Sequence, residues 1–313
     1  MTANSSGTTS WLVTGAAGML GQDVLAELAG DPTVKVTALG RADLDITDPA
    51  AVLSAVAGHD VVVNCAAWTN VDAAESAEEA ATAVNGSGVR NLAEACATVG
   101  ARLLHVSTDY VLPGDATEPY AETAPTGPVN AYGRSKLVGE QAVTQLLPEH
   151  GYIVRTAWLY GEHGPNFVAT MLKAATQRET LDVVDDQHGQ PTWSRALAAQ
   201  LVALGHAALA GRAPAGVYHG TSTGRTTWFG LAREAYRLTG LDPERIRQTD
   251  SAAFVRPAVR PAFSVLAHER WAQAGLEPMP TWDRSLAEAL TRPGFQALGQ
   301  AALQAPTHAP SQG

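Results

Sequence analysis

A glycine-rich turn near the amino end of the chain restricts the fold more than any other feature of the sequence. An apolar run at residues 12–14 leads into Gly15, Gly18 and Gly21, and a helical pattern follows at 22–29. Glycines at a strand-to-helix junction allow a tight turn, a close approach of backbone N–H groups to a pyrophosphate, and packing of the helix on its strand. The spacing differs by one residue from the common G-x-G-x-x-G pattern, and alone it is also typical of an ordinary turn in an α/β domain.

Strand and helix patterns alternate after this turn. Strands are expected at 11–14, 34–39, 61–65, 103–107 and 153–159, and helices at 48–57, 76–100 and 132–147. Asp48 before Pro49 is typical of a helix N-cap, and Gly86 and Gly88 form a weak point in the long alanine-rich helix. This order predicts an α/β fold with a doubly wound parallel sheet of Rossmann type.

The pattern becomes less regular past residue 160. Helices are expected at 166–177, 192–209 with Thr192 as N-cap, 228–239 and 285–290, and short strands at 181–184 and 217–219. We therefore predict a dinucleotide-binding domain at 11–162, to whose sheet later segments return, and a mainly substrate-binding domain at 163–303. Residues 1–10 and 304–313 have the composition of flexible tails.

Charge and composition exclude several classes of partner. The net charge is −10 and no basic run is present, which argues against nucleic acid or an anionic membrane as a partner. The amino end is polar, unlike a signal peptide, and no apolar run reaches membrane-spanning length. The two cysteines, Cys65 and Cys96, are expected to be buried thiols in a reducing compartment. We therefore expect a cytoplasmic protein.

Tyr132 and Lys136 are the first candidates for chemistry. They lie four residues apart, on one face of the expected helix. A nearby ammonium lowers the pKa of a tyrosine, so that its proton can move during a reaction. Thr108 follows an expected strand, at the edge where ligands of open α/β sheets bind, and its hydroxyl could hydrogen-bond a carbonyl oxygen. A Tyr-x-x-x-Lys pair is common by chance, but the three elements in this order are far more specific.

With these residues the chain resembles the extended short-chain dehydrogenase/reductase family. Within that family it is most similar to the subfamily that reduces dTDP-4-dehydrorhamnose and related 4-keto sugars. The resemblance spans about residues 11–295, and its second half, around Trp158 and Gln187, differs from general sugar epimerases. The matching stretches are 14–21, 44–48, 63–72, 107–111, 132–136, 155–161, 166–168, 186–192 and 260–261.

The resemblance implies an oxidoreductase of nucleotide-sugar biosynthesis. It would reduce the 4-keto group of a dTDP-4-keto-6-deoxyhexose with hydride from a nicotinamide, giving dTDP-L-rhamnose or a relative. Tyr132 would protonate the carbonyl oxygen, Lys136 would tune Tyr132 and bind the nicotinamide ribose, and Thr108 would orient the keto oxygen. The residues implied to contact the substrate are Val71, Thr108, Asp109, Trp158 and Arg260. For Trp158, packing in the core is the alternative interpretation.

The resemblance implies most of the cofactor contacts, and one further contact is suggested by a basic residue at a position that is often acidic. Arg41 stands where an NAD-specific domain often has an acidic residue, and it could meet a 2′-phosphate. This favours NADPH, although the family often accepts NADH, and the alternative is a solvated arginine. The other implied cofactor contacts are Gly15, Gly18, Met19, Leu20, Asp45, Ile46, Ala67, Trp68, Thr69, Tyr132 and Lys136.

Some positions depart from the family. Phe263 stands where an asparagine or a tyrosine is frequent, which puts the nucleotide contact there in doubt. Well-known members bind magnesium through glutamates at the interface of a homodimer. Asp23 falls near one such position, the others have no match, and the nine histidines lack ligand spacing, so no metal site is predicted.

Two alternative functions share most of these motifs. One is a reductase of antibiotic sugar biosynthesis that differs in substrate stereochemistry. The other is a non-catalytic dinucleotide-binding regulatory subunit, similar to the β-subunit of methionine adenosyltransferase. The presence of Thr108, Tyr132 and Lys136 together favours an enzyme.

Overall fold

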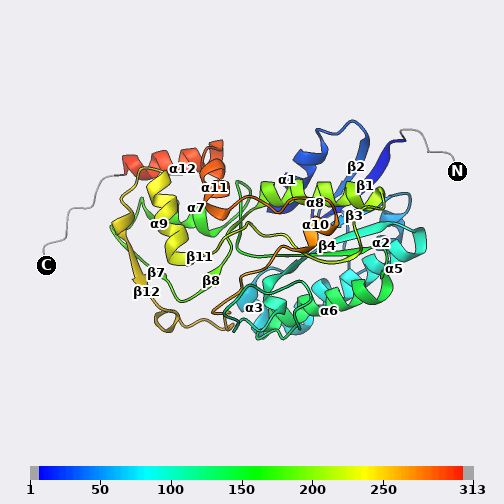
Figure 1. The fold of residues 1–313 in the computed structure, drawn as a ribbon, viewed down its shortest axis with the longest axis horizontal. Coiled ribbons are helices and arrows are strands. Elements are labelled where there is room, and N and C mark those ends of the chain that lie inside the picture. The colour runs from blue at the N-terminus through cyan, green and yellow to red at the C-terminus, as the bar shows by residue number, and fades with distance from the viewer. Residues whose placement is uncertain (1–6, 306–313) are drawn as a thin grey trace, which may run out of the picture.

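A six-stranded parallel sheet is the centre of the molecule. The computed structural model describes residues 7–305. The strand order is β10-β5-β4-β3-β1-β2, and every neighbouring pair is parallel, which confirms the predicted doubly wound sheet (Figure 1). The strands are β1 (Thr9–Thr14), β2 (Val34–Leu39), β3 (Val61–Asn64), β4 (Arg102–Thr108), β5 (Gly151–Thr156) and β10 (Gly216–His219).

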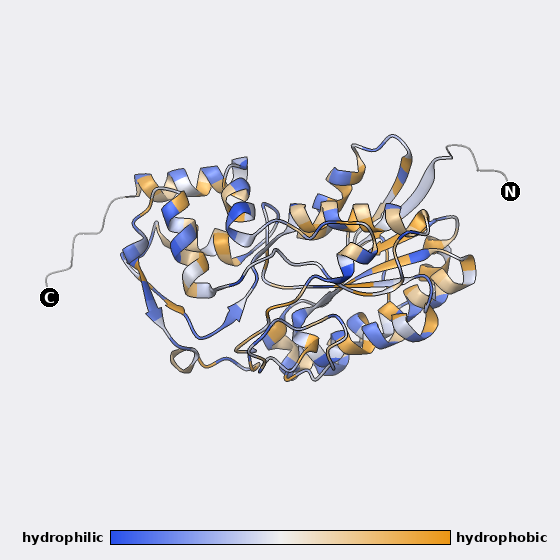
Figure 2. Ribbon diagram, in the orientation of Figure 1, coloured by the Kyte–Doolittle hydropathy of each residue, from blue (hydrophilic) through white to orange (hydrophobic). Residues whose placement is uncertain are grey.

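Helices cover both faces of this sheet. α1 (Met19–Leu28) and α8 (Ser194–Leu209) pack together on one face, near α10 (Arg270–Gln273). The other face carries α2 (Pro49–Val56), α5 (Val89–Val99) and α6 (Ala131–Leu146). Side chains along β1 alternate between the two resulting cores: Trp11 and Val13 face α1 and α8, whereas Leu12 faces α2 and α5. Apolar residues accordingly follow the strands of the sheet (Figure 2).

The helical region expected at 76–100 is helical over nearly its whole length, but it is not one regular α-helix. It consists of α4 (Glu78–Thr82), a π-helical segment (Ala83–Gly88) and α5, and a short helix, α3 (Val71–Ser76), precedes it. The irregular segment coincides with the expected weak point. A Cβ atom at Gly86 would lie 2.7 Å from Val138, and one at Gly88 would lie 2.7 Å from Ile46. The two glycines therefore let the segment approach its neighbours.

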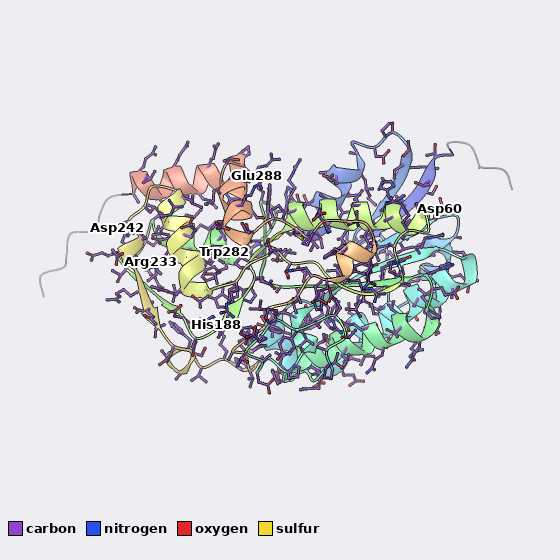
Figure 3. The ribbon with its side chains drawn as sticks, in the orientation of Figure 1. Asp60, His188, Arg233, Asp242, Trp282 and Glu288 are labelled. Carbon is purple, nitrogen blue, oxygen red and sulfur yellow. The ribbon has the colours of Figure 1, made fainter. Side chains whose placement is uncertain are left out.

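A smaller lobe packs beside the carboxyl edge of the sheet. It contains α7 (Phe167–Ala174), α9 (Trp228–Leu238), α11 (Trp282–Ala289) and α12 (Pro293–Gln304) around a core of its own. Short strand pairs join its segments: β7 (Leu181–Val184) with β12 (Ile246–Thr249), and β8 (His188–Gly189) with β11 (Thr226–Thr227). Figure 3 shows Asp60, which precedes β3, at the end of the sheet remote from this lobe, so the strands run toward it.

Several element boundaries differ from the predictions. The strand expected at 153–159 ends at Thr156, and the left-handed backbone of Trp158 (φ 48°) turns the chain into β6 (Leu159–Tyr160). The helix expected from Thr192 begins at Ser194, because Thr192–Trp193 form β9, paired with β6; Trp193 takes the N-cap position. The α12 helix was not predicted.

The predicted tails are shorter where the structure describes them. Thr9 and Ser10 belong to β1, and Gln304 ends α12. Residues 1–6 and 306–313 lie outside the described part. Between residues 7 and 305, no helix combines the length and the apolar character that a membrane crossing requires.

Candidate active site

The glycine-rich turn has the geometry that a dinucleotide phosphate site requires. Gly15 has a left-handed backbone (φ 66°), and a Cβ there would lie 2.5 Å from the backbone nitrogen of Ala66. A Cβ at Gly21 would lie 2.4 Å from the carbonyl oxygen of Gly15, so only glycine lets α1 pack this closely on its strand. Gly18 is the N-cap of α1 and provides no side-chain cap. The first-turn N–H groups of α1 and the positive end of its dipole therefore suit a phosphate.

The residues after β2 lie beside this turn. Gly40 is close to Ala17 in the turn, because a Cβ atom added at Gly40 would lie 3.5 Å from the Cβ of Ala17. Arg41 follows Gly40, and its side chain is exposed. Hydrogen bonds from Thr47, with a smaller contribution from the Arg41 charge, lower the pKa of Asp45. Ile46 is buried against Gly88. This places Arg41, Asp45 and Ile46 in one surface strip next to the glycine turn.

Asn85 holds the segment after β3 and was missed by the sequence analysis. Its side-chain oxygen accepts from the Trp68 N–H at 2.9 Å, and its amide donates to the Trp68 carbonyl at 3.0 Å and to the Ser135 hydroxyl at 2.9 Å. Asn85 lies fully buried in the π-helical segment. A lone asparagine between alanine-rich turns and two glycines is the only signal in the sequence. Through it the segment 67–69 is fixed to α6, one residue before Lys136.

Thr108 and Tyr132 converge at the carboxyl end of β4. Thr108 is the last residue of β4, and its hydroxyl donates to Asp109 at 2.9 Å and lies near enough to Tyr132 to oppose the rise of that side chain's pKa. Asn130 caps α6 by accepting from the Gly133 N–H at 2.8 Å. A Cβ at Gly133 would lie 2.1 Å from the Tyr110 carbonyl oxygen, so this glycine lets the first turn of α6 reach the end of β4.

Tyr132 is held as a neutral phenol. It is partly exposed, but desolvation and then the nearby Asp109 charge raise the pKa of Tyr132 above its ordinary value. The prediction that Lys136 lowers this pKa is wrong, because Lys136 is not among the groups that shift it. Lys136 is buried, and its side-chain nitrogen donates to the Val106 carbonyl at 2.7 Å. Burial also lowers the pKa of Lys136 to about 8. A neutral phenol is the form that can protonate a carbonyl oxygen.

Asp109 is the second ionisable group beside Tyr132. It is buried, its Oδ1 accepts from Thr108, and its Oδ2 has no partner among the described residues. Desolvation raises the pKa of Asp109 to about 6, against the opposing influence of the nearby Ser264 and Thr108 hydroxyls. An unpartnered buried carboxylate oxygen is suited to accept a hydroxyl of a ligand.

Trp158 belongs to a stack of aromatic rings. Its indole lies parallel to that of Trp228, with ring centroids 3.7 Å apart and an interplanar angle of 11°, and Phe167 packs on Trp228 at 4.6 Å. The Trp228 indole N–H donates to Gln187 at 3.1 Å. Gly189 lies against the edge of Trp158, where a Cβ would be 2.5 Å from the ring. One face of Trp158 is therefore packed, while the residue as a whole stays partly exposed.

Arg260 and the start of α3 come together from distant parts of the chain. Arg260 forms an ion pair with Asp72 at 3.0 Å and donates to the Ala258 carbonyl at 3.0 Å. Val71, next to Asp72, begins α3, which Asn70 caps. Asp72 was not predicted as a site residue, and nothing in its local sequence indicates a partner so far along the chain.

The remaining residues that the sequence singled out are packed against other residues of the protein. Phe263 is buried, with its ring 6.4 Å from that of His188 and the Arg225 guanidinium 6.0 Å from its centroid. Asp23 is buried between α1 and α8 and accepts from the Ser194 hydroxyl. Across residues 7–305, no group of three or more His, Cys, Asp or Glu side chains is arranged to hold a metal ion. Cys65 and Cys96 are free thiols, and burial raises the pKa of each to about 12.

Comparison with known families gives a match along nearly the whole chain. The model of the RmlD substrate binding domain matches residues 9–294. A dTDP-4-dehydrorhamnose reductase of Streptomyces griseus is 60% identical over 89% of this chain and 92% of the relative. A dTDP-4-keto-6-deoxy-D-glucose reductase of Streptomyces niveus is 52% identical over 90% of this chain and 96% of the relative.

A solved structure agrees with these relatives. The dTDP-4-dehydrorhamnose reductase of Bacillus anthracis, in complex with NADP, superposes with a TM-score of 0.85 at 35% identity, covering 90% of this chain and 99% of the other. At this identity the likeness extends beyond the general Rossmann-type fold.

Proposed function

The chain belongs to the RmlD substrate binding domain family, and from this premise we propose that it is an NADPH-dependent reductase of dTDP-4-keto-6-deoxyhexoses. The substrate would be dTDP-4-dehydro-L-rhamnose and the product dTDP-L-rhamnose. The observation that carries the proposal is the neighbouring pair of hydroxyls, Thr108 and Tyr132, at the carboxyl end of β4, beside a glycine turn that suits a dinucleotide. The 60% identical reductase supports the substrate class.

The site residues divide the reaction between them. NADPH, when bound, supplies the hydride that the C4 carbon accepts. Thr108 turns its hydroxyl from Asp109 to donate a hydrogen bond to the C4 oxygen and orient it, and Tyr132 transfers its phenolic proton to that oxygen as charge develops there. The C=O double bond becomes a C–O–H group, and Tyr132 is left as a phenolate. Lys136 as an ammonium stabilises this phenolate and binds the nicotinamide ribose, which requires it to leave the Val106 carbonyl.

The position of C4 beside Thr108 and Tyr132 also determines which residues we assign to the rest of the sugar nucleotide. Asp109 accepts a sugar hydroxyl on its free oxygen, and the unstacked side of Trp158 contacts the apolar surface of the hexose. Val71 and Arg260, which Asp72 holds, are assigned to the nucleotide part by the same proposal. Arg41, exposed beside the glycine turn, meets the 2′-phosphate and favours NADPH over NADH. A cytoplasmic location and a homodimer stay predictions.

One assay tests the proposal against its two alternatives. The purified protein is incubated with NADPH and dTDP-4-dehydro-L-rhamnose, and in parallel with dTDP-4-keto-6-deoxy-D-glucose, while the absorbance of the reduced nicotinamide is followed. NMR of the product gives the C4 configuration. Turnover of the first substrate to dTDP-L-rhamnose is expected. Preference for the second substrate would favour the antibiotic-sugar reductase, as the 52% identical relative's name suggests. NADPH binding without turnover of either would favour the regulatory subunit.

A further inference from the structure

A row of buried polar side chains crosses the sheet beneath the candidate active site. Thr14, Asn64 and His105 stand opposite one another on β1, β3 and β4, and all three are buried. The Thr14 hydroxyl donates to Asn64 Oδ1 at 2.7 Å, and Asn64 Nδ2 lies 3.0 Å from His105 Nδ1. The row ends at the active site, since His105 Nε2 is 3.4 Å from Lys136 Nζ. The proposed reaction uses none of the first three residues.

The hydrogen bonds of this row fix which nitrogen of His105 carries the proton. The Ala66 backbone N–H, which can only donate, points at Asn64 Oδ1 at 3.1 Å. The amide orientation is thereby set, and the NH₂ group of Asn64 faces His105 Nδ1. Because an amide NH₂ also only donates, Nδ1 must accept, and the neutral imidazole carries its hydrogen on Nε2. Burial holds the pKa of His105 well below its usual value, so the ring stays neutral.

The Nε2–H group of His105 therefore points at Lys136 Nζ. An ammonium has no lone pair, so in that form two donors face each other. A neutral amine can accept from Nε2–H while it still donates to the Val106 carbonyl. The arrangement favours the neutral amine, in the same direction as the burial that lowers the pKa of Lys136 to about 8.

The other titratable groups near Lys136 do not reverse this preference. Glu140, one turn further along α6, favours the ammonium, but it is bound in a buried pair by Arg155 of β5 at 2.8 Å. Cys65, after β3, keeps its proton because burial raises its thiol pKa to about 12. Tyr132, one turn earlier on α6, is a neutral phenol. His105 is thus the side chain in hydrogen-bond range of Nζ that discriminates between its two forms.

We propose that His105, fixed by Asn64 with its proton on Nε2, is a positioning residue that favours the neutral amine of Lys136 in the free protein, so that in alkaline solution NADPH binding is coupled to uptake of one proton by Lys136. The proton comes from solvent and adds to the lone pair of Nζ, and no bond of the cofactor changes. The imidazole does not relay this proton through the sheet, because its Nδ1 lone pair is occupied by the Asn64 amide. The inference rests on the proposed function only in taking NADPH as the ligand.

Calorimetry of NADPH binding in buffers of different ionisation enthalpy measures this proton directly. At a pH about one unit above the Lys136 pKa of about 8, the wild-type protein should take up nearly one proton per NADPH. The cofactor phosphates are fully ionised at that pH in both states and contribute nothing. His105→Leu removes the opposing N–H, so a larger fraction of Lys136 is protonated in the free protein and the uptake should fall below the wild-type value. His105→Gln should act in the same direction, because its amide can turn its oxygen toward the ammonium.

Ile153→Val is the matched control. Ile153 stands opposite His105 in the β4–β5 register and is buried, so its truncation disturbs the same place without touching Lys136. Its proton uptake should equal that of the wild type. Unchanged uptake in both His105 variants, or no uptake by the wild type, would overturn the proposal; if His105→Leu does not fold, His105→Gln decides. Failure of the proposed function would appear separately, as normal NADPH binding and proton uptake without sugar turnover.

Discussion

The two ends of the candidate site are built from different kinds of contact. At the proton-transfer end, Thr108 closes β4 and Tyr132 and Lys136 occupy the first turns of α6, so strand ends and a helix cap position them. At the sugar end, Trp158 depends on Trp228 in another lobe, and Arg260 depends on Asp72 in α3. The first set is positioned by regular backbone, and the second by contacts between segments far apart in the chain.

This difference predicts how each end responds to substitution. Where backbone positions a reactive group, removal of that group changes the chemistry and leaves packing nearly intact. Where side chains position one another, a single truncation changes substrate binding and stability together. Four substitutions, taken from the largest expected effect to the smallest, test whether the two ends differ in this way.

Tyr132→Phe should reduce the turnover rate by about 10²- to 10⁴-fold, since it removes the proton donor. NADPH affinity and the melting temperature should stay close to wild type, because only one hydroxyl is lost from a helix held by the Asn130 cap. Single-turnover kinetics on the purified variant measure the effect. Tyr110→Phe is the matched control: its ring lies edge-on to Tyr132 at 6.0 Å, and its hydroxyl has no proposed role. Near-normal turnover of Tyr132→Phe would remove the proton-donor assignment.

Arg41→Ala should raise the Michaelis constant for NADPH by about ten- to a hundredfold, and that for NADH much less. Only NADPH carries the phosphate that this arginine is proposed to meet, and a hydrogen bond to a charged group contributes about 1.5–3 kcal/mol. Steady-state kinetics with both cofactors decide the matter. Lys35→Ala, an exposed cation on the preceding strand, controls for the change in net charge. Equal effects on the two cofactors would show that Arg41 is a solvated arginine.

The sequence predicts the first end of the site better than the second, for a physical reason. Glycine spacing, strand ends and the Tyr132–Lys136 pair are local, so Gly15, Thr108 and α6 were placed correctly. Asn85 was not found, because its contact with Trp68 exists only once the π-helical segment brings the two together.

The second end depends on pairings that no local pattern contains. The parallel contact of Trp158 with Trp228 requires the left-handed turn after β5, which the expected strand at 153–159 excluded. The start of α8 at Ser194 likewise follows from the pairing of β9 with β6. Asp72 and Arg260 form their ion pair although the chain between them passes through both lobes.

Trp158→Ala should raise the Michaelis constant for the sugar nucleotide by about tenfold and also lower the melting temperature by several degrees. The ring is expected to contribute to the sugar contact through its free side and to stability through Trp228, and each such contact is worth about 1 kcal/mol or more. NADPH affinity should be unchanged. Melting temperature, NADPH affinity and kinetics are measured on one preparation.

Trp228→Ala separates the two contributions of Trp158. It removes the same stacked pair and the hydrogen bond to Gln187 but leaves the Trp158 ring in place. The melting temperature should fall as much as in Trp158→Ala, and the sugar Michaelis constant should rise less. A destabilised Trp158→Ala variant whose folded fraction has normal sugar kinetics would assign Trp158 to packing alone.

Asp72→Asn should have the smallest effect, a rise of about threefold in the Michaelis constant for the sugar nucleotide, which is about 0.6 kcal/mol and within the range of partly exposed ion pairs. The variant keeps the shape of the side chain but removes the charge that holds Arg260, whose side chain is only 18% exposed. Arg256→Ala is the control, since Arg256 meets the same carboxylate at 3.5 Å with 60% of its side chain exposed and should change nothing.

The pH dependence of this pair sharpens the test. Desolvation raises the pKa of Asp72, but hydrogen bonds from Arg260 and Ala258 outweigh it and the net pKa lies below the ordinary value of 3.8. Asp72 is therefore ionised throughout the neutral range, and its contribution is lost only as the pH falls through that lowered pKa. The ratio of Michaelis constants between wild type and Asp72→Asn should accordingly be constant across neutral and alkaline pH. A ratio that changes near neutrality would mean that another group holds Arg260, and that the sugar end does not depend on this long-range contact.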